Sequence, residues 1–319
     1  MAPHPAVTLI PANSVQAPRS VVMMRPHNFT VNTETAADNS FQQTATVVDA
    51  DAVRALAHAE VTAVAETLQT HGIRVHLLED EGTTTPDSVF LNNWFTTHPG
   101  GHVAVHSMFA PSRRRERRSD IIELLKREYR VQDVIDYSGL EYDDLFLEGT
   151  GALVFDHHER VAYVARSNRA HPVLLERFCT HFNYEPVVFD TAGPDGQPIY
   201  HTNVLMTIGT DFALVGFDLM TDAARAAEIR TRLEETGRTI IALTTAQIES
   251  FAGNTIELSG TSGRILALSE TAFASLTPDQ RATIEESATL VPLRVPTIEL
   301  AGGSVRCMIA GIHLSARPH

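Results

Sequence analysis

EGTGALVFDHHERVAYVARS, residues 148–167, holds two apolar runs on either side of the polar segment DHHER. Runs of this length, rich in β-branched and aromatic residues and joined by a short polar turn, predict a β-hairpin. An apolar pattern with helical spacing follows at residues 171–182, and the run PVVFD comes next at residues 186–190. This region therefore predicts one unit of strand, strand, helix and strand.

The same pattern recurs along the chain, and its five copies begin at Asn93, Glu148, His201, Asn254 and Cys307. The last four starts are separated by 53 residues each, and the first precedes them by 55. A fixed period of this size indicates a repeated supersecondary unit. The pattern predicts five helices, at residues 52–71, 112–129, 171–182, 222–236 and 278–287. It also predicts a strand after each helix and a first strand at residues 20–26.

Units of this kind cannot bury their apolar faces alone, whereas a closed ring of them leaves no sheet edge exposed. We therefore expect an α/β fold with five-fold pseudosymmetry, an α/β propeller built from ββαβ units. Residues 1–20, rich in Pro and Ala, are expected to be a flexible extension, and residues 21–319 a single catalytic domain. In a ring, the five equivalent starts should meet in one central cavity. For Asn254 a simple strand-start role is the favoured interpretation.

The composition is that of a globular protein, with 43% hydrophobic and 20% charged residues. The net charge of −14 makes nucleic acid an unlikely partner. Since no apolar run is long enough to span a bilayer, no membrane partner is expected either, and we expect a soluble, cytoplasmic protein. The two cysteines lack metal-site spacing, so no metal is expected. Cys179 has the surroundings of a buried helical residue.

Five short motifs resemble those of the pentein superfamily of guanidine-modifying enzymes, which includes arginine deiminases and dimethylarginine hydrolases. They are PDSVFLNNW at 86–94, LEGTG at 147–151, SNR at 167–169, HTN at 201–203 and GGSVRCM at 302–308. The resemblance implies that Cys307, His201 and Glu148 are catalytic. It also implies that Arg169 binds the carboxylate of the substrate.

Two positions depart from the arginine deiminase pattern. Asn93 and Asn203 stand where those enzymes have aspartates that clasp a cationic guanidinium. A buried guanidinium needs carboxylates, whereas amides offer both donors and acceptors to a neutral ureido group. The chain also resembles a citrulline-hydrolysing branch of the superfamily, including in residues 25–42 and 251–258, to which no role is assigned. Citrulline is therefore the expected substrate.

Further candidate substrate-binding residues are Asp87, Asn92 and Arg25. Asp87 could equally cap its hairpin, and Arg25 could equally be a structural ion-pair partner. Arg25 gains interest because Gly302 stands where arginine deiminases have a second arginine. The basic run RRRERR at 113–118 is expected to be the solvated face of a helix.

The expected reaction is attack of the Cys307 thiolate on the ureido carbon, with His201 and Glu148 moving protons. It needs no metal or organic cofactor. The alternatives are a deiminase of arginine or another guanidino compound, a non-catalytic amino-acid-binding pentein and, less favoured, an amidinotransferase. A small-molecule ureido or guanidino amino acid is the expected partner, and a homo-oligomer is compatible with the sequence.

Overall fold

The computed structural model describes residues 15–43 and 49–318. Its strands are β1 (Ser20–Pro26), β2 (Arg74–Asp80), β3 (Phe95–His98), β4 (His102–Val105), β5 (Asp133–Asp136), β6 (Val154–Asp156), β7 (Val161–Ala165), β8 (Glu185–Phe189), β9 (Met206–Ile208), β10 (Phe212–Val215), β11 (Thr239–Ala242), β12 (Ile256–Ser259), β13 (Arg264–Ser269), β14 (Thr289–Leu293) and β15 (Ala310–Ile312). They form five separate three-stranded sheets, ordered β15-β1-β2, β3-β4-β5, β6-β7-β8, β9-β10-β11 and β12-β13-β14. In each sheet the central strand pairs antiparallel with one neighbour and parallel with the other.

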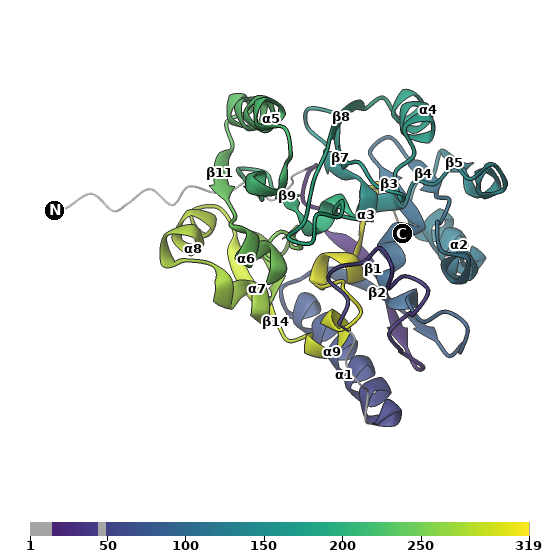
Figure 1. Ribbon diagram of the computed structural model, residues 1–319. Helices are drawn as coiled ribbons and strands as arrows, with labels where there is room; N and C mark the ends of the chain where they lie inside the picture. The colour runs from purple at the N-terminus through teal and green to yellow at the C-terminus, as the bar shows by residue number, and fades with distance from the viewer. Residues whose placement is uncertain (1–14, 44–48, 319) are drawn as a thin grey trace.

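Each parallel pair is joined by a helical crossover, because parallel strands cannot be connected by a tight turn. The crossover helices are α1 (Ala50–Thr70), α2 (Ser119–Glu128), α4 (Pro172–Phe182), α5 (Ala223–Glu235) and the pair α7 (Glu270–Ser275) and α8 (Pro278–Glu285). Figure 1 shows α1, α2, α4, α5 and α8 at the periphery, with the strands inside them. The predicted α/β class and the order of strands and helices in each unit are therefore confirmed.

Short helical segments complete the described chain. They are α3 (Gly149–Ala152), α6 (Thr245–Glu249), α9 (Pro296–Glu299) and the 3-10 turns η1 (Ser88–Asn93), η2 (Pro111–Glu116), η3 (Ser138–Asp143), η4 (Thr202–Val204), η5 (Phe217–Leu219) and η6 (Val305–Met308). The predicted helix at 112–129 is thus η2 followed by α2. Four of the five repeat starts lie in or beside such segments instead of opening a strand: Asn93 ends η1, Glu148 and His201 precede α3 and η4, and Cys307 lies within η6.

One strand of every sheet faces a common space, which we call the central cavity. Its lining includes residues of β3, β6, β9, β12 and β15. These strands are the first of each repeated hairpin, so all five units contribute residues to the lining of this cavity. The repeat starts lie two to six residues before these strands, and none of the five is in the lining of this cavity.

The packed part of the chain begins before residue 21. The side chain of Gln16 donates hydrogen bonds to the carbonyls of Phe155 and Ile208, at 2.9 Å each. The carbonyl of Pro18 accepts from the Ser259 backbone, and the strand β1 then pairs antiparallel with β15. The flexible extension predicted for residues 1–20 is therefore wrong for residues 16–18, because Gln16 satisfies backbone groups that would otherwise be buried without partners. Residues 1–14 lie outside the described residues.

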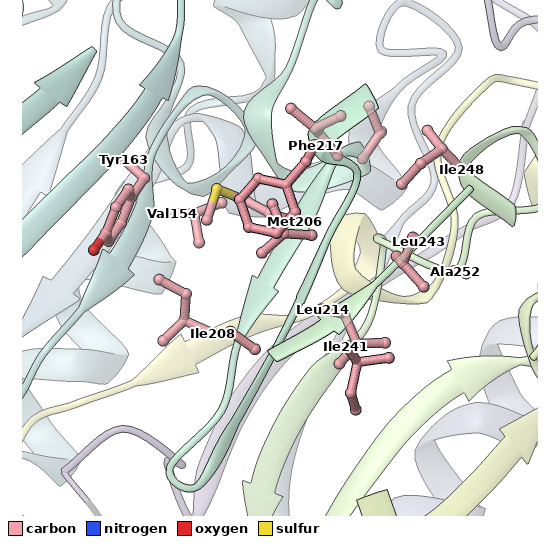
Figure 2. Packing of buried hydrophobic residues seen from close by; sticks show 14 of the residues in the cluster. Val154, Tyr163, Met206, Ile208, Leu214, Phe217, Ile241, Leu243, Ile248 and Ala252 are labelled. Carbon is pink, nitrogen blue, oxygen red and sulfur yellow. The ribbon is translucent and has the colours of Figure 1, made fainter. Parts of the chain in front are cut away.

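Apolar clusters fill the space between neighbouring sheets. Figure 2 shows one of them, in which residues of β6 and β7 meet residues of β9, β10 and β11. Met206 and Leu214 are almost completely buried there. Cys179 is buried on the inner face of α4, as predicted. None of the described helices is both long and apolar enough to cross a bilayer.

Candidate active site

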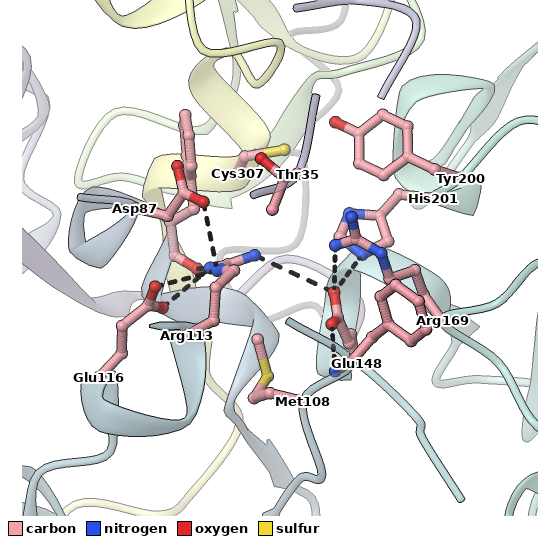
Figure 3. A network of polar contacts seen from close by, with 12 residues as sticks. Thr35, Asp87, Met108, Arg113, Glu116, Glu148, Arg169, Tyr200, His201 and Cys307 are labelled. Atoms are coloured by element: carbon pink, nitrogen blue, oxygen red, sulfur yellow. Dashed lines mark hydrogen bonds and ion pairs between the residues drawn. The ribbon is translucent and has the colours of Figure 1, made fainter. Parts of the chain in front are cut away.

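A pocket gathers most of the predicted site residues from segments that are distant in the sequence (Figure 3). It is lined by Thr35, Asn39, Asp87, Phe90, Asn93, Arg113, Arg169, Tyr200, His201, Ala301, Gly303 and Cys307. Its free space is about 20 Å³, which is enough for a water molecule but not for an amino acid. An amino-acid substrate therefore does not fit into this pocket as the structure has it.

Glu148 is the hub of the polar contacts in this pocket. Its Oε2 lies 2.8 Å from His201 Nε2 and accepts a hydrogen bond of 3.0 Å from Arg169 Nη1. Its Oε1 accepts from the backbone N–H of Phe109. Burial of Glu148 opposes its ionisation, but Arg169, His201 and Arg113 outweigh this effect and hold its pKa well below the ordinary value. Glu148 is therefore a carboxylate.

His201 is fully enclosed, and burial lowers its pKa in spite of the nearby Glu148 carboxylate. The imidazole is therefore neutral in the resting protein. Because its Nε2 faces an ionised carboxylate, the ring is oriented with a proton on that nitrogen. His201 can accept a second proton, and Glu148 would stabilise the resulting cation.

The thiol of Cys307 is surrounded by amides. Nδ2 of Asn254 donates to Sγ at 3.2 Å and Nδ2 of Asn203 at 3.5 Å. Burial raises the pKa of Cys307, and these two donors oppose the shift. His201 lines the same pocket, but the hydrogen bonds of the thiol among the described residues go to the amides. Asn254 is thus more than the start of a hairpin.

Asn93 and Asn92 are held by close packing against the glycines of EGTG. A Cβ atom on Gly151 would lie 2.3 Å from Asn93 Oδ1 and 2.7 Å from His201 Nδ1. A Cβ on Gly149 would lie 2.4 Å from the carbonyl of Asn92, and the backbone there has a φ of +31°. The amide of Asn92 lies 3.2 Å from Thr150 Oγ1, and Asn92 is not among the residues that line the pocket. Only glycine lets these two segments approach so closely.

Asp87 lines the pocket and is tied to its wall. Its carboxylate accepts from Asn32 Nδ2 at 2.8 Å and lies 3.7 Å from Arg113 Nε. Burial raises the pKa of Asp87 against the effect of Arg113. The hydrogen-bonding interpretation is thus the one that the structure supports, because the side chain makes no cap bond to η1.

Arg113 was not expected in the site. The prediction of a solvated face for residues 113–118 is wrong here, because Arg113 is 2% exposed and forms a bidentate pair with Glu116. It also donates to the carbonyl of Phe90 and lies 4.0 Å from Glu148. Five of the six residues at 113–118 are arginines, and the sequence alone does not show which of them turns inward. Glu116, three residues later on the same turn, is the one signal that points to Arg113.

A second unexpected contribution comes from residues 27–43, which contain no helix or strand. Asp38 accepts two hydrogen bonds from Arg169, through Nε at 3.0 Å and Nη2 at 2.7 Å. Thr35 and Asn39 line the pocket, and Asn39 donates to the carbonyl of Ala301. Residues 27–42 of this segment belong to the stretch 25–42, to which no role could be assigned from the sequence.

Arg25 lies outside the pocket. It pairs with Glu79 and donates to Thr62 at 3.0 Å, so its ion-pair interpretation is the correct one. His27, His58 and Glu79 lie close enough to share a cation, but Glu79 is already occupied by Arg25 and His27. Substrate recognition by Arg25 is therefore contradicted by its position.

Comparison with known families identifies the chain. The family model described as N,N dimethylarginine dimethylhydrolase, eukaryotic, matches residues 25–314. The chain belongs to this family, within the pentein superfamily. Its members are hydrolases of C–N bonds, so the predicted enzyme class is confirmed. No curated protein matches the sequence.

Solved structures of pentein enzymes share the fold at low sequence identity. Unliganded ArgZ, an arginine dihydrolase from the ornithine-ammonia cycle in cyanobacteria, has a TM-score of 0.70 and 16% identity over 91% of this chain. This chain spans 40% of the length of that protein. The N-terminal domain of ArgZ, covalently bound to a reaction intermediate, has a TM-score of 0.71 and 16% sequence identity. The match covers 92% of this chain and 97% of that domain. A dimethylarginine dimethylaminohydrolase variant, as an adduct with S-methyl-L-thiocitrulline, has a TM-score of 0.61 and 14% sequence identity. The match covers 92% of this chain and 99% of that chain.

Proposed function

We propose that this protein hydrolyses the neutral ureido group of citrulline to give ornithine, carbon dioxide and ammonia. The proposal is carried by one observation: the nucleophilic sulfur of Cys307 lies among uncharged amides, with Asn203 and Asn254 donating to it. Asn93 adds a further amide to the pocket lining. The groups that hydrogen-bond to the sulfur include no carboxylate for a cationic guanidinium, whereas a ureido group would find donors and acceptors among them.

The first step would begin with the thiol of Cys307 and the imidazole of His201 both uncharged. The resting thiol is protonated and His201 is neutral, for the reasons given above. When the ureido carbon approaches Sγ, the thiol proton passes to His201, whose cation is stabilised by Glu148. The sulfur would then attack the carbon and form a tetrahedral adduct, and the amides of Asn93 and Asn203 would donate to its oxyanion.

In the second step, His201 returns its proton to the leaving nitrogen, and ornithine departs. The carbamoyl group remains on the sulfur. His201, now neutral, removes a proton from a water molecule that attacks this thioester-like carbon. Carbamate leaves, the thiol is restored, and carbamate breaks down to carbon dioxide and ammonia. Arg169 would bind the α-carboxylate of the substrate once Asp38 releases it.

A guanidino substrate is the second candidate, and Asp87 is the observation that favours it. This carboxylate lines the pocket, and ArgZ and dimethylarginine dimethylaminohydrolase act on arginine or a derivative of it by their names. We rank it second because Asp87 is already compensated by Arg113 and Asn32.

The deciding experiment is a parallel incubation with citrulline and with arginine, assayed for ornithine, citrulline and ammonia. Ornithine from citrulline at a higher kcat/KM than any product from arginine is the expected result. Citrulline as the product of arginine would overturn the proposal. Cys307→Ser provides the background and should lose turnover while it keeps its unfolding midpoint. An unactivated thiol, with ordinary alkylation kinetics, would indicate a non-catalytic binding protein.

The domain organisation and the cellular location are proposed on separate observations. A single domain with five-fold propeller symmetry is supported by the five sheets around the central cavity. A cytoplasmic location is supported by two free cysteines, which are typical of a reducing compartment. Formation of a homo-oligomer stays a prediction.

A further inference from the structure

The side-chain amide of Asn254 is held in one orientation. Asn254 is fully buried, and its Oδ1 accepts a hydrogen bond of 3.2 Å from the backbone N–H of Ser304. Its Nδ2 donates to the carbonyl of Asn203 at 2.9 Å and to Sγ of Cys307 at 3.2 Å. Because a backbone N–H can only donate and a carbonyl can only accept, these partners exclude the flipped amide. An N–H of Asn254 therefore faces the sulfur.

The amide of Asn203 is not held in this way. Within residues 15–43 and 49–318 the hydrogen bonds of its side chain go to the same sulfur, with Nδ2 donating at 3.5 Å and Oδ1 accepting from the thiol at 3.7 Å. Asn203 is therefore able to serve the thiol as acceptor in the resting protein. Asn254 is the donor whose direction the surrounding structure sets.

The backbone around Asn254 is packed just as closely. A Cβ atom on Gly253 would lie 2.4 Å from the carbonyl oxygen of Val204, so this segment lies against η4. The backbone N–H of Asn254 donates to the carbonyl of Phe251, whose φ is +61°. These residues belong to the stretch 251–258, to which no role was assigned from the sequence. One effect of this stretch is to place Asn254 between η4 and η6.

Ser304 presents the backbone N–H that orients Asn254, and it is tied to a buried carboxylate. The Ser304 hydroxyl donates to Oε1 of Glu299 at 2.8 Å, and Oε2 accepts from the hydroxyl of Thr271 at 2.8 Å. Ser304 is fully buried and Glu299 is 5% exposed. The short connection between them includes Gly302, whose φ is +80°, and glycine leaves the backbone few restraints of its own. The bond to Glu299 therefore fixes Ser304.

We propose that Asn254 is a catalytic donor to the sulfur of Cys307. Glu299, acting through Ser304, is the positioning residue that keeps this donor in place. A donor held 3.2 Å from Sγ stabilises the thiolate after its proton has passed to His201. The same donor stabilises the thiolate again when the C–S bond of the carbamoyl intermediate breaks. The inference rests on the proposed role of Cys307 as nucleophile, but not on the identity of the substrate.

The direct test is the pKa of the Cys307 thiol, measured from the pH dependence of its alkylation by iodoacetamide in the full chain without substrate. Asn254→Ala removes the donor and should raise this pKa by about 1. Asn254→Asp keeps an acceptor for the Ser304 N–H, replaces the donor by a carboxylate and should raise the thiol pKa by about 2. A thiol pKa that stays at its native value in these variants would overturn the proposal.

Gln69→Glu is the matched control for the added charge, because Gln69 is exposed on α1. It should leave the thiol pKa unchanged. Cys179 is a second thiol, so the label is assigned to Cys307 by peptide mapping. The variants alter none of the other charged or titratable groups that face the thiol, which are the preceding Arg306 and, in the pocket lining, Asp87, Arg113, Arg169, Tyr200 and His201.

Two variants of Glu299 test its positioning role. Glu299→Gln keeps an oxygen that accepts from the Ser304 hydroxyl and should retain the native thiol pKa. Glu299→Ala removes the tether, so the thiol pKa should rise and the alkylation rate at pH 7 should fall about threefold or more. A purely structural role would lower the urea midpoint and leave the thiol pKa unchanged. Equal thiol pKa values in Glu299→Ala and the native protein would therefore contradict the positioning role.

These measurements involve no turnover, so their outcome is separate from that of the proposed function. A raised thiol pKa in the variants together with no hydrolysis of citrulline would uphold the inference and overturn the proposed substrate. With whichever amino acid the native protein turns over, kcat/KM of Asn254→Ala should fall by about tenfold. A raised thiol pKa with native kcat/KM would show that the donor is not catalytic.

Discussion

Asp38 and Arg169 are joined by two hydrogen bonds, although 131 residues separate them in the chain. The Asp38 carboxylate accepts hydrogen bonds from Nε and Nη2 of the guanidinium, and the Glu148 carboxylate accepts one from Nη1. The group that should hold the substrate carboxylate is therefore already engaged by two carboxylates of the protein. For a substrate carboxylate to take its place on Arg169, Asp38 has to move away from the guanidinium.

Asp38→Ala should therefore lower the KM for the amino acid, by about two- to fivefold, since a partly exposed ion pair is worth up to ~1 kcal/mol. Its kcat should change little. Arg169→Ala should raise the KM, which distinguishes competition for the guanidinium from a general loosening of the site. A large rise of KM in Asp38→Ala would instead mean that Asp38 holds the substrate itself.

Asn203→Asp tests the role of the amides. It would replace an amide donor 3.5 Å from Cys307 Sγ by a carboxylate, which raises the pKa of the thiol and repels the developing thiolate. We expect kcat/KM for citrulline to fall by about tenfold or more. The ratio of arginine to citrulline turnover should rise, because a guanidinium gains a counter-charge. A variant that keeps its citrulline activity would remove Asn203 from the proposed mechanism.

Arg113→Met should destabilise the fold by about 3–5 kcal/mol, because it leaves the enclosed Glu116 and Asp87 without their cation. The double variant with Glu116→Gln should recover part of this loss, since one of the stranded charges is removed. Urea unfolding gives the free energy of unfolding of the single and the double variant. Arg115→Met, on the exposed side of the same turn, is the control and should stay within about 0.5 kcal/mol of the native protein. A mild effect of Arg113→Met would show that its ion pairs are not needed.

Gly151→Ala should abolish activity at a modest cost in stability. The new methyl group would lie 2.3 Å from Asn93 Oδ1 and 2.7 Å from His201 Nδ1, so one or both side chains must leave their positions. The matched control is Gly139→Ala, where an added Cβ has no neighbour within 4 Å. Steady-state kinetics should separate the two variants, and equal activity would mean that the packing of EGTG is not what positions these side chains.

Acid should unfold the protein through histidines whose pKa is lowered by burial. Burial lowers the pKa of His106 to about 3 and that of His313 to about 4, whereas both groups titrate near 6.5 in the unfolded chain. The unfolded state therefore binds protons first, and stability that is fully present above pH 6.5 is lost as the pH falls toward 4. Each group contributes a slope of about 1.4 kcal/mol per pH unit.

The measurement is urea unfolding as a function of pH. His106→Gln should show a shallower loss between pH 6.5 and 4, whatever its stability at neutral pH. His158→Gln, an exposed neighbour of the hairpin turn, should keep the native slope. An unchanged slope in His106→Gln would contradict the assignment of His106 as an enclosed neutral group.

The repeat pattern in the sequence was sufficient to predict five strand–strand–helix–strand units and the convergence of Asn93, Glu148, His201, Asn254 and Cys307. The elements are local properties, because hydrophobic periodicity sets each of them. The convergence follows from the constant spacing, which makes the units equivalent. The amide pair Asn93 and Asn203, on which the ureido proposal rests, was also readable from residue types alone.

Other features depended on contacts that no local pattern encodes. Arg113 turns inward to Asp87 and Glu116 while its neighbour Arg115 faces solvent, and a run of arginines looks the same in either case. Asp38 reaches Arg169 from a segment without regular structure, and Arg306 and Cys307, adjacent in sequence, line different cavities. Only tertiary structure decided these, because a buried charge takes its place from whichever partner the packing of distant segments brings within hydrogen-bond distance.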